Sequence, residues 1–312
     1  MLRDEPGGAL PGVVVAVLNP QTRLIEDVAL SEDGHAQEGT LLDGLVETIR
    51  ARQLWLADRH YCTSAWLFAL HRRQAFFLIR QHLGHLRWRR AGRRRSRGRT
   101  DTGKVYEQTV VLTDPETAEE MTIRRISVVL DQPTRDGDRE LHLLSNGPAQ
   151  DASALVLAAL DRDRWQLETA FCELTVYLCC ELNTLGSPPA ALFGFCAAVA
   201  CYNVLAAVKG ALRAAHGKEA EENLSSYYVT AEVSGTYRGM AIAVPDEDWA
   251  VFRTAGPAEL AGLLTQLARG MDLNYYRKHT RAPKKPKKSR TSAPRKHFAT
   301  ARLVNRNNSR AK

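Results

Sequence analysis

The sequence predicts an α/β protein with a mixed sheet, a β-rich insertion and a helical C-terminal half. Three observations lead to this prediction. Short apolar runs and helical spacings alternate as β-β-α-β-α-β over residues 1–80. Short alternating or β-branched segments, separated by turn residues, occupy residues 81–148, and helical spacing dominates residues 149–275. The remaining residues, 276–312, are rich in Lys, Arg, Pro and Ser, which predicts a basic disordered tail.

The first part begins with two apolar, β-rich runs, Val13–Leu18 and Leu24–Ala29. The turn residues Asn19–Thr22 lie between them and indicate a hairpin. Gln37–Arg52 then has apolar residues at helical spacing. The remaining elements predicted here are a strand over Leu54–Asp58, a helix over Ser64–Arg73 and a strand over Ala75–Arg80.

The insertion and the helical part follow in that order. We expect insertion strands over Tyr106–Thr113, Met121–Leu130 and Glu140–Ser145, and helices over Asp151–Leu182, Pro188–His216 and Pro257–Leu273. From Pro188 to Val208 the second helix has no charged residue, so its length would allow it to cross a bilayer. It is rich in Ala and starts with a good N-cap and first-turn pair, Ser187-Pro188. We therefore predict a buried core helix and no membrane.

Positive charge is concentrated in two segments, although the formal net charge is only +8. Residues Arg277–Lys312 contain 14 Lys and Arg, Arg87–Arg99 contains 8 Arg, and neither segment contains an acid. The rest of the chain is acidic, which predicts a polyanion such as DNA as the partner of the basic segments. For the arginine run the alternative is a mobile, solvated loop. The candidate DNA-contacting residues are Arg89, Arg90, Arg93, Arg94, Arg95, Lys284, Lys285, Lys287 and Lys288, together with Arg164 outside these two segments.

The six cysteines do not show the spacing of a structural zinc site. Most of them lie in apolar helical stretches, where a free Cys behaves as a small hydrophobe. Met1–Pro6 has no apolar signal-peptide region. We therefore expect a cytoplasmic protein in a reducing compartment.

Two carboxylates have contexts typical of metal ligands. Asp58 ends the apolar run Leu54–Asp58, and Glu168 lies within the helical stretch Arg164–Phe171. A carboxylate at a strand end and another on a later helix can converge on Mg²⁺ or Mn²⁺, a common arrangement for phosphodiester chemistry. The alternatives are an N-cap role for Asp58 and a solvated Glu168 that pairs with Arg164 one turn earlier.

Several sequence blocks occur in a fixed order across residues 10–215. They are Glu32–Glu38, Trp55–Thr63, Thr134–Asp138, Leu141–Asn146, Arg164–Phe171 and Tyr202-Asn203. In these blocks the chain resembles a DDE transposase of bacterial insertion sequences, of the group called insertion sequence four. That resemblance implies a ribonuclease-H-like core.

The resemblance also implies the roles of the two carboxylates. Asp58 corresponds to the second catalytic Asp and Glu168 to the catalytic Glu, both as ligands of Mg²⁺ (or Mn²⁺). The family's helix signature, Tyr-x2-Arg-x3-Glu-x6-Lys, matches at Arg164 and Glu168, whereas Asp161 and Thr175 replace its Tyr and Lys. The implied activity is cleavage and strand transfer of DNA. The implied partners are the element ends and the target DNA, bound by a homodimer in a synaptic complex.

The resemblance is incomplete at the front of the chain. In the family, the first catalytic Asp ends a first core strand that precedes the hairpin. Here only twelve residues precede the hairpin, and they read as a Gly/Pro-rich loop. We therefore expect an N-terminally truncated transposase that lacks one of three metal ligands and is inactive alone. The alternatives are a non-catalytic nucleic-acid-binding remnant that uses its basic segments, and a nuclease of the same fold.

Overall fold

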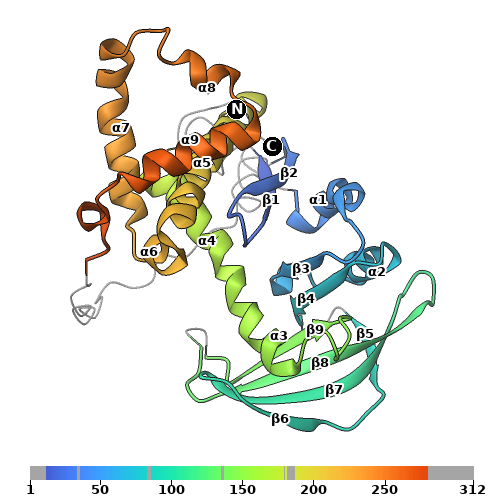
Figure 1. Ribbon diagram of the computed structural model, residues 1–312. Coiled ribbons are helices and arrows are strands. Elements are labelled where there is room, and N and C mark those ends of the chain that lie inside the picture. Colours follow the sequence, from blue (N-terminus) through green and yellow to red (C-terminus); the bar gives the residue numbers. More distant parts are fainter. Residues whose placement is uncertain are drawn as a thin grey trace, which may run out of the picture. The chain divides into compact units, whose positions relative to one another are not determined.

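The computed structural model describes residues 12–33, 36–82, 86–134, 137–178, 180 and 187–279 (Figure 1). The chain divides into two compact units, which are treated separately below. The sheet unit comprises Gly12–Cys180 and Cys196–Ala206, and the helical unit comprises the other residues. The predicted tail, including Lys284, Lys285, Lys287 and Lys288, lies outside the described residues.

The sheet unit begins with a two-stranded antiparallel sheet. Strand β1 (Val13–Leu18) pairs with β2 (Ile25–Ser31), as the sequence predicts, with Val13 opposite Ser31. Helix α1 (Glu38–Leu45) follows, and a 3-10 turn over Val46–Thr48 ends it. The predicted helix up to residue 52 is therefore too long. Its end is fixed by tertiary structure, because the backbone N–H of Arg52 donates to the carbonyl of Gln74.

A larger mixed sheet forms the centre of this unit. Its strand order is β3-β4-β9-β8-β7-β5, and β6 also pairs with β7. The β3–β4 pair is parallel and the other pairs are antiparallel, which confirms the predicted mixed sheet. The strands are β3 (Leu54–Ala57), β4 (Phe76–Arg80), β5 (Arg87–Arg90), β6 (Arg95–Arg99), β7 (Gly103–Thr113), β8 (Glu120–Leu130) and β9 (Glu140–Ser145).

The arginine run forms strands β5 and β6 instead of a loop. Both strands pair with β7, one after the other, along the same edge. Arginine has little intrinsic preference for strands, so this pairing reflects cross-strand contacts and not local propensity. The side chains are nevertheless exposed, with Trp88 as the partly buried exception in β5.

Helices cover both faces of the sheet. On one face, Phe68 of helix α2 (Ser64–Arg72) packs in one core with Phe77 and Val110 of the strands. On the other face, Leu157 of α3 (Ala154–Leu160) packs against buried strand residues. Alternate residues of a strand face opposite sides, so consecutive strand residues contribute to different cores.

The long helix predicted over residues 151–182 is interrupted. After α3 come a 3-10 turn (Asp161–Arg164), helix α4 (Trp165–Cys172) and a π-helical turn (Glu173–Tyr177). The first interruption coincides with Asp161, whose carboxylate is bound by Arg80 of β4. Apolar periodicity alone cannot reveal such a tertiary anchor.

A third core joins the hairpin to α4 and α5. Helix α5 (Pro188–His216) has the predicted boundaries, and its residues 196–206 belong to the sheet unit. Tyr202 is buried there with Ile25 and Leu174. The side-chain amide of Asn203 donates to the carbonyl of Ile25 and accepts from its N–H, both at 2.9 Å.

Among its described residues, the helical unit contains four further helices. They are α6 (Lys218–Glu222), α7 (Ser226–Ala243), α8 (Ala250–Thr254) and α9 (Pro257–Arg269). Only α9 was predicted from the sequence, with its end placed too late. Leu212, Leu224 and Ala268 form a small core in this unit.

Helix α5 has an apolar composition over most of its length. By length and composition alone it is the one helix in the described ranges that could cross a membrane, with 33% of its most apolar window buried. Such a helix is weak support for a membrane span, since core helices pass the same test. Ala198, Tyr202 and Leu205 are buried, whereas Phe193 is 77% exposed. The predicted burial therefore applies to one side of the helix.

Candidate active site

Asp58 lies directly after the parallel edge strand β3. One of its oxygens, Oδ1, accepts a hydrogen bond from the backbone N–H of Arg59 at 2.8 Å. This bond caps a short 3-10 turn over Arg59–Tyr61. The other oxygen, Oδ2, is directed to Arg164. The capping role and a ligand role thus use different oxygens of the same carboxylate and are compatible.

Glu168 and Asp58 converge on the guanidinium group of Arg164. Nη1 of Arg164 lies 3.6 Å from Oδ2 of Asp58 and 3.8 Å from Oε1 of Glu168. The two carboxylate oxygens are therefore separated by no more than the sum of these distances. The side chain of Asp58 is 34% exposed and that of Glu168 is 57% exposed, so both can be reached from solvent. The structure brings together the three residues that the sequence singled out here.

Arg164 is surrounded by carboxylates but is poorly hydrogen bonded. Its side chain is only 13% exposed, and its Nε atom is buried without a hydrogen-bond partner, 3.9 Å from Oδ1 of Asp161. All three contacts to acids exceed the usual hydrogen-bond distance. The guanidinium group is therefore held by charge and by its position over the ring of Trp165, at 5.6 Å. A cation held in this way can be displaced without breaking short hydrogen bonds.

Arg80 and Asp161 form a tight pair behind this group. Arg80, at the end of β4, donates from Nη2 to Oδ2 of Asp161 at 2.7 Å and from Nε to both oxygens. Burial lowers the pKa of Arg80, but the hydrogen bond and the charge of Asp161 outweigh it, so the pKa is raised overall. The pair fixes the 3-10 turn that ends at Arg164. Arg80 was not predicted as a site residue, although a cation that ends a buried strand is a usable signal.

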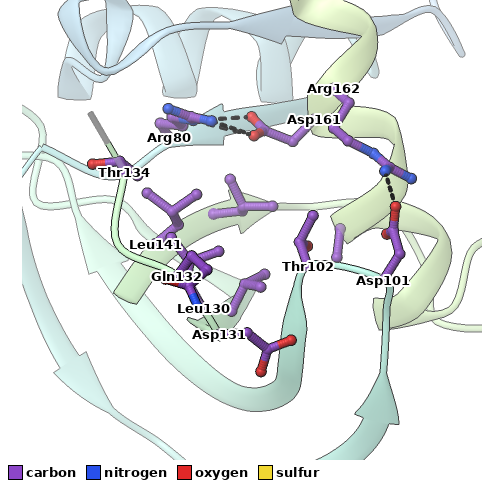
Figure 2. Close-up of a pocket in the computed structure, with 13 residues that line it drawn as sticks. Arg80, Asp101, Thr102, Leu130, Asp131, Gln132, Thr134, Leu141, Asp161 and Arg162 are labelled. Carbon is purple, nitrogen blue, oxygen red and sulfur yellow. Dashed lines mark hydrogen bonds and ion pairs between the residues drawn. The ribbon is translucent and has the colours of Figure 1, made fainter. Parts of the chain in front are cut away.

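A pocket of about 410 Å³ adjoins this pair (Figure 2). The pair Arg80–Asp161 lies at one side, and the pair Arg162–Asp101, at 2.5 Å, lies at another. The floor is apolar and is formed by Val128, Leu130, Leu141 and Leu143 of the sheet and Ala158 of α3. This pocket could not be predicted from the sequence, because its walls come from five separate segments.

The residues around Arg164 fit a divalent cation with partial protein ligation. Mg²⁺ takes oxygen ligands and is often held by one or two carboxylates, together with water and substrate phosphate. Asp58 and Glu168 already share one cationic group, and their converging oxygens make only long contacts with it. Within the described ranges no group of three or more His, Cys, Asp or Glu side chains could hold a metal ion. The fit is therefore to two protein ligands.

Two neighbours of Asp58 are kept protonated. Tyr61 donates to Glu38 at 2.9 Å, and its pKa is raised by burial, by Glu38 and by the charge of Asp58. Burial also raises the pKa of Cys62, which disfavours a thiolate nucleophile. Neither side chain therefore adds negative charge near Asp58.

The candidate DNA-contacting arginines fall into two classes. Arg89 pairs with Glu120 at 3.0 Å, and Arg94 pairs with Glu140 at 2.6 Å. No ion pair involves Arg90, Arg93 or Arg95 within the part of the chain that the structure describes. These three are exposed and have no acidic partner there.

A comparison with protein-family models gives a match. The family model described as a transposase DDE domain matches residues 6–204, which include Asp58, Glu168 and all strands of both sheets. No curated protein matches the chain.

Proposed function

The chain belongs to the transposase DDE-domain family, whose model covers more than half of it. We propose that it is the catalytic region of a transposase that cleaves DNA and transfers the cut strand with Mg²⁺ or Mn²⁺, and that the isolated chain is inactive. Transposase function follows from family membership. We propose, in addition, that the activity depends on a metal, that particular residues hold this metal, and that the isolated chain is inactive.

The convergence of Asp58 and Glu168 on one guanidinium nitrogen supports the proposal most strongly. Both residues would hold the metal, with Asp58 oriented by the N–H of Arg59. A bound divalent cation would activate water or a DNA 3′-hydroxyl for attack on phosphorus and stabilise the leaving oxygen. The carboxylates then act as ligands, so no covalent bond between protein and DNA is required.

Arg164 has a separate role in this proposal. Its guanidinium group neutralises the two carboxylates while no metal is bound, and it competes with the metal for them. Once displaced, it is free to contact a DNA phosphate, for which the planar guanidinium group is well suited. Arg80 and Asp161 act as positioning residues, because they hold the turn from which Arg164 projects.

The remaining partners and the organisation of the chain are also proposals. DNA would bind at the element ends and at the target, to a homodimer in the cytoplasm. The basic tail and the exposed Arg90, Arg93 and Arg95 would contact phosphates, as would Arg89 and Arg94 once freed from their acids. The predicted boundaries between the parts of the chain, after residues 80, 148 and 275, remain a prediction. So does the expectation of inactivity, which rests on the absence of a third matching carboxylate from the sequence blocks.

The proposed metal site is tested by metal binding. We expect Asp58→Asn and Glu168→Gln to weaken Mn²⁺ binding in calorimetry by about tenfold or more, since a metal ligand is lost from each. Glu47→Gln is the matched control, because Glu47 is an exposed acid of the same unit that pairs with Arg73. Unchanged Mn²⁺ affinity in both site variants would refute the metal site.

A second candidate function is non-catalytic nucleic-acid binding through the basic segments. Within the described ranges Arg90, Arg93 and Arg95 form no ion pair with an acid, which favours it. Salt-dependent DNA binding by a chain that binds no Mn²⁺ and nicks no DNA would select this alternative. Mg²⁺-dependent joining of DNA ends by the purified chain would exclude it, and would also overturn the expected inactivity.

A further inference from the structure

Three cationic side chains share one face of the larger sheet. Arg90 on β5 lies opposite Val110 on β7, which lies opposite Ile123 on β8. Arg125 follows Ile123 by two residues, so it points to the same face as Arg90. Lys104 precedes Val110 by an even number of residues on β7 and also points to this face. Arg90 and Lys104 are exposed, and Arg125 is partly buried.

A fourth cation lies over the same face. The guanidinium group of Arg94, from the β5–β6 connection, stacks over the ring of Tyr106 at 4.2 Å. It also pairs with Glu140 of β9 at 2.6 Å. Tyr106 and Lys104 are two residues apart on β7 and therefore share a face.

Acidic residues are unevenly divided between the two faces of these strands. Strands β5, β7, β8 and β9 contain three acids, Glu107, Glu120 and Glu140. Glu107 and Glu120 point to the opposite face, where they pair with arginines. Glu140 is thus the single acid that these described strands present to the four cations.

Arg125 shows the charge imbalance most clearly. Its Nε donates to the side-chain carbonyl of Gln81 at 2.6 Å, and its guanidinium group lies 5.2 Å from the ring of Trp88. It has no carboxylate within ion-pair distance in the described ranges. Burial lowers its pKa, and Arg94 and Arg90 lower it further, against the opposing charge of Glu140. A partly buried cation without an acidic partner is unfavourable, and an anionic ligand would relieve the cost.

The aromatic rings favour a particular ligand. When a guanidinium group stacks on a ring, its N–H bonds lie in its own plane and point away from the ring. They remain available for bidentate contact with phosphate oxygens. A guanidinium group lies over each of these rings, so that face of the ring is not open to a base. The ligand that fits is a row of phosphates without base readout.

We infer that the face carrying Arg90, Arg94, Lys104 and Arg125, here called the cationic sheet face, binds the phosphate backbone of DNA. The inference rests on the proposed function, which makes DNA the substrate, and it assigns part of that binding to Arg125 and Lys104. Neither residue belongs to the basic segments recognised in the sequence. Binding there is independent of sequence and of the divalent metal.

The test is the salt dependence of DNA binding by the full chain, measured by fluorescence anisotropy with EDTA present. The probe is a duplex of about 30 base pairs, titrated at several salt concentrations from about 50 to 200 mM. Each of Arg125→Gln, Arg90→Gln and Lys104→Gln removes one phosphate contact. We expect each to lower the slope of log K against log salt by about 0.9.

The matched control is Arg89→Gln. Arg89 adjoins Arg90 on β5 and is equally exposed, but it points to the opposite face and pairs with Glu120. Its slope should change less than that of Arg90→Gln. The inference would be overturned if Arg89→Gln and Arg90→Gln lowered the slope equally. It would also be overturned if Arg125→Gln, Arg90→Gln and Lys104→Gln all left the slope unchanged.

Two features keep the result interpretable. Arg90 and Lys104 are exposed, so their variants test the inference even if Arg125→Gln unfolds, as melting curves would show. If the unmodified chain binds DNA and the variants keep its slope, the inference fails and DNA binding stands. If the unmodified chain does not bind DNA at all, the proposed function fails with it.

Discussion

Two regions of the sheet unit carry opposite excesses of charge. At the candidate active site, three carboxylates face two guanidinium groups. These groups belong to Asp58, Asp161, Glu168, Arg80 and Arg164. On the cationic sheet face, the relation is reversed, and Glu140 faces four cations. Each region is therefore incomplete as it stands, one lacking positive charge and the other negative charge.

The difference indicates what each region binds. A surplus of carboxylates around a long, weakly bonded guanidinium contact suits a divalent cation. A surplus of guanidinium groups backed by aromatic rings suits phosphate. The two regions lie toward opposite edges of one sheet, β3 and β5. A phosphate backbone and a metal ion are also the two ligands that a DNA-cleaving enzyme must hold together, which makes the contrast informative.

The largest expected effect tests whether the tail, and not the sheet, dominates attraction to DNA. Deleting residues 277–312 removes 14 Lys and Arg. If about five of them contact phosphate, the salt slope should fall by about 4.5, and affinity should become much less sensitive to salt. The measurement is the anisotropy titration described above. If the deletion leaves the salt slope unchanged, the phosphate contacts belong to the remaining part of the chain and not to the tail.

The second prediction concerns the Arg80–Asp161 ion pair at the candidate active site. Arg80→Leu leaves the carboxylate of Asp161 buried without its main partner, and we expect a loss of stability of about 3 kcal/mol in urea unfolding. The double variant Arg80→Leu/Asp161→Leu should recover part of this loss, because no buried charge remains. If the double variant is as unstable as the sum of both single variants, the pair is not energetically coupled.

The third prediction concerns competition at Arg164. Arg164→Gln removes the cation between Asp58 and Glu168, so the metal-free protein should melt at a lower temperature. Mn²⁺ should bind about fivefold to tenfold more tightly, a modest change because the carboxylates are partly exposed and screened. Arg162→Gln is the control, since Arg162 pairs with Asp101 and not with either carboxylate. Equal destabilisation with and without Mn²⁺ would indicate a purely structural arginine.

Much of the fold could be predicted, because many of its elements have strong local sequence patterns. Val13–Leu18 and Pro188–His216 have the predicted boundaries, since an uninterrupted β-branched run and a Pro-initiated apolar helix are strong local signals. The convergence of Asp58 with Glu168 was also expected. There the sequence blocks supplied the long-range information that periodicity lacks.

The rest depends on contacts between distant segments. The break at Asp161 requires Arg80, which lies 81 residues away in sequence. The strands of the arginine run become favourable only when acids of later strands, such as Glu107 and Glu120, lie beside them. The cationic sheet face was missed for the same reason. Its members are isolated cations in the sequence, and the sheet register alone brings them onto one face.

The smallest predicted effect examines the cationic sheet face through His142. This histidine lies between the cations, with its Nδ1 atom 2.9 Å from the hydroxyl of Ser127. Burial lowers its pKa to about 4, with a further contribution from Arg125. In the unfolded chain it titrates at its ordinary value of 6.5. Between these values the unfolded state binds the additional proton, so stability should fall as the pH falls from 6.5 toward 4.

Removing the neighbouring charge should weaken this dependence. Arg125→Gln leaves the burial of His142 but removes one repulsive cation, so the pKa of His142 should rise by about half a unit in an NMR titration. The acid-induced loss of stability should shrink accordingly, whereas Arg89→Gln on the opposite face should leave both unchanged. An unaltered His142 pKa in Arg125→Gln would mean that burial alone sets it. The positive potential of the cationic sheet face would then be too weak at His142 to support the phosphate binding inferred from it.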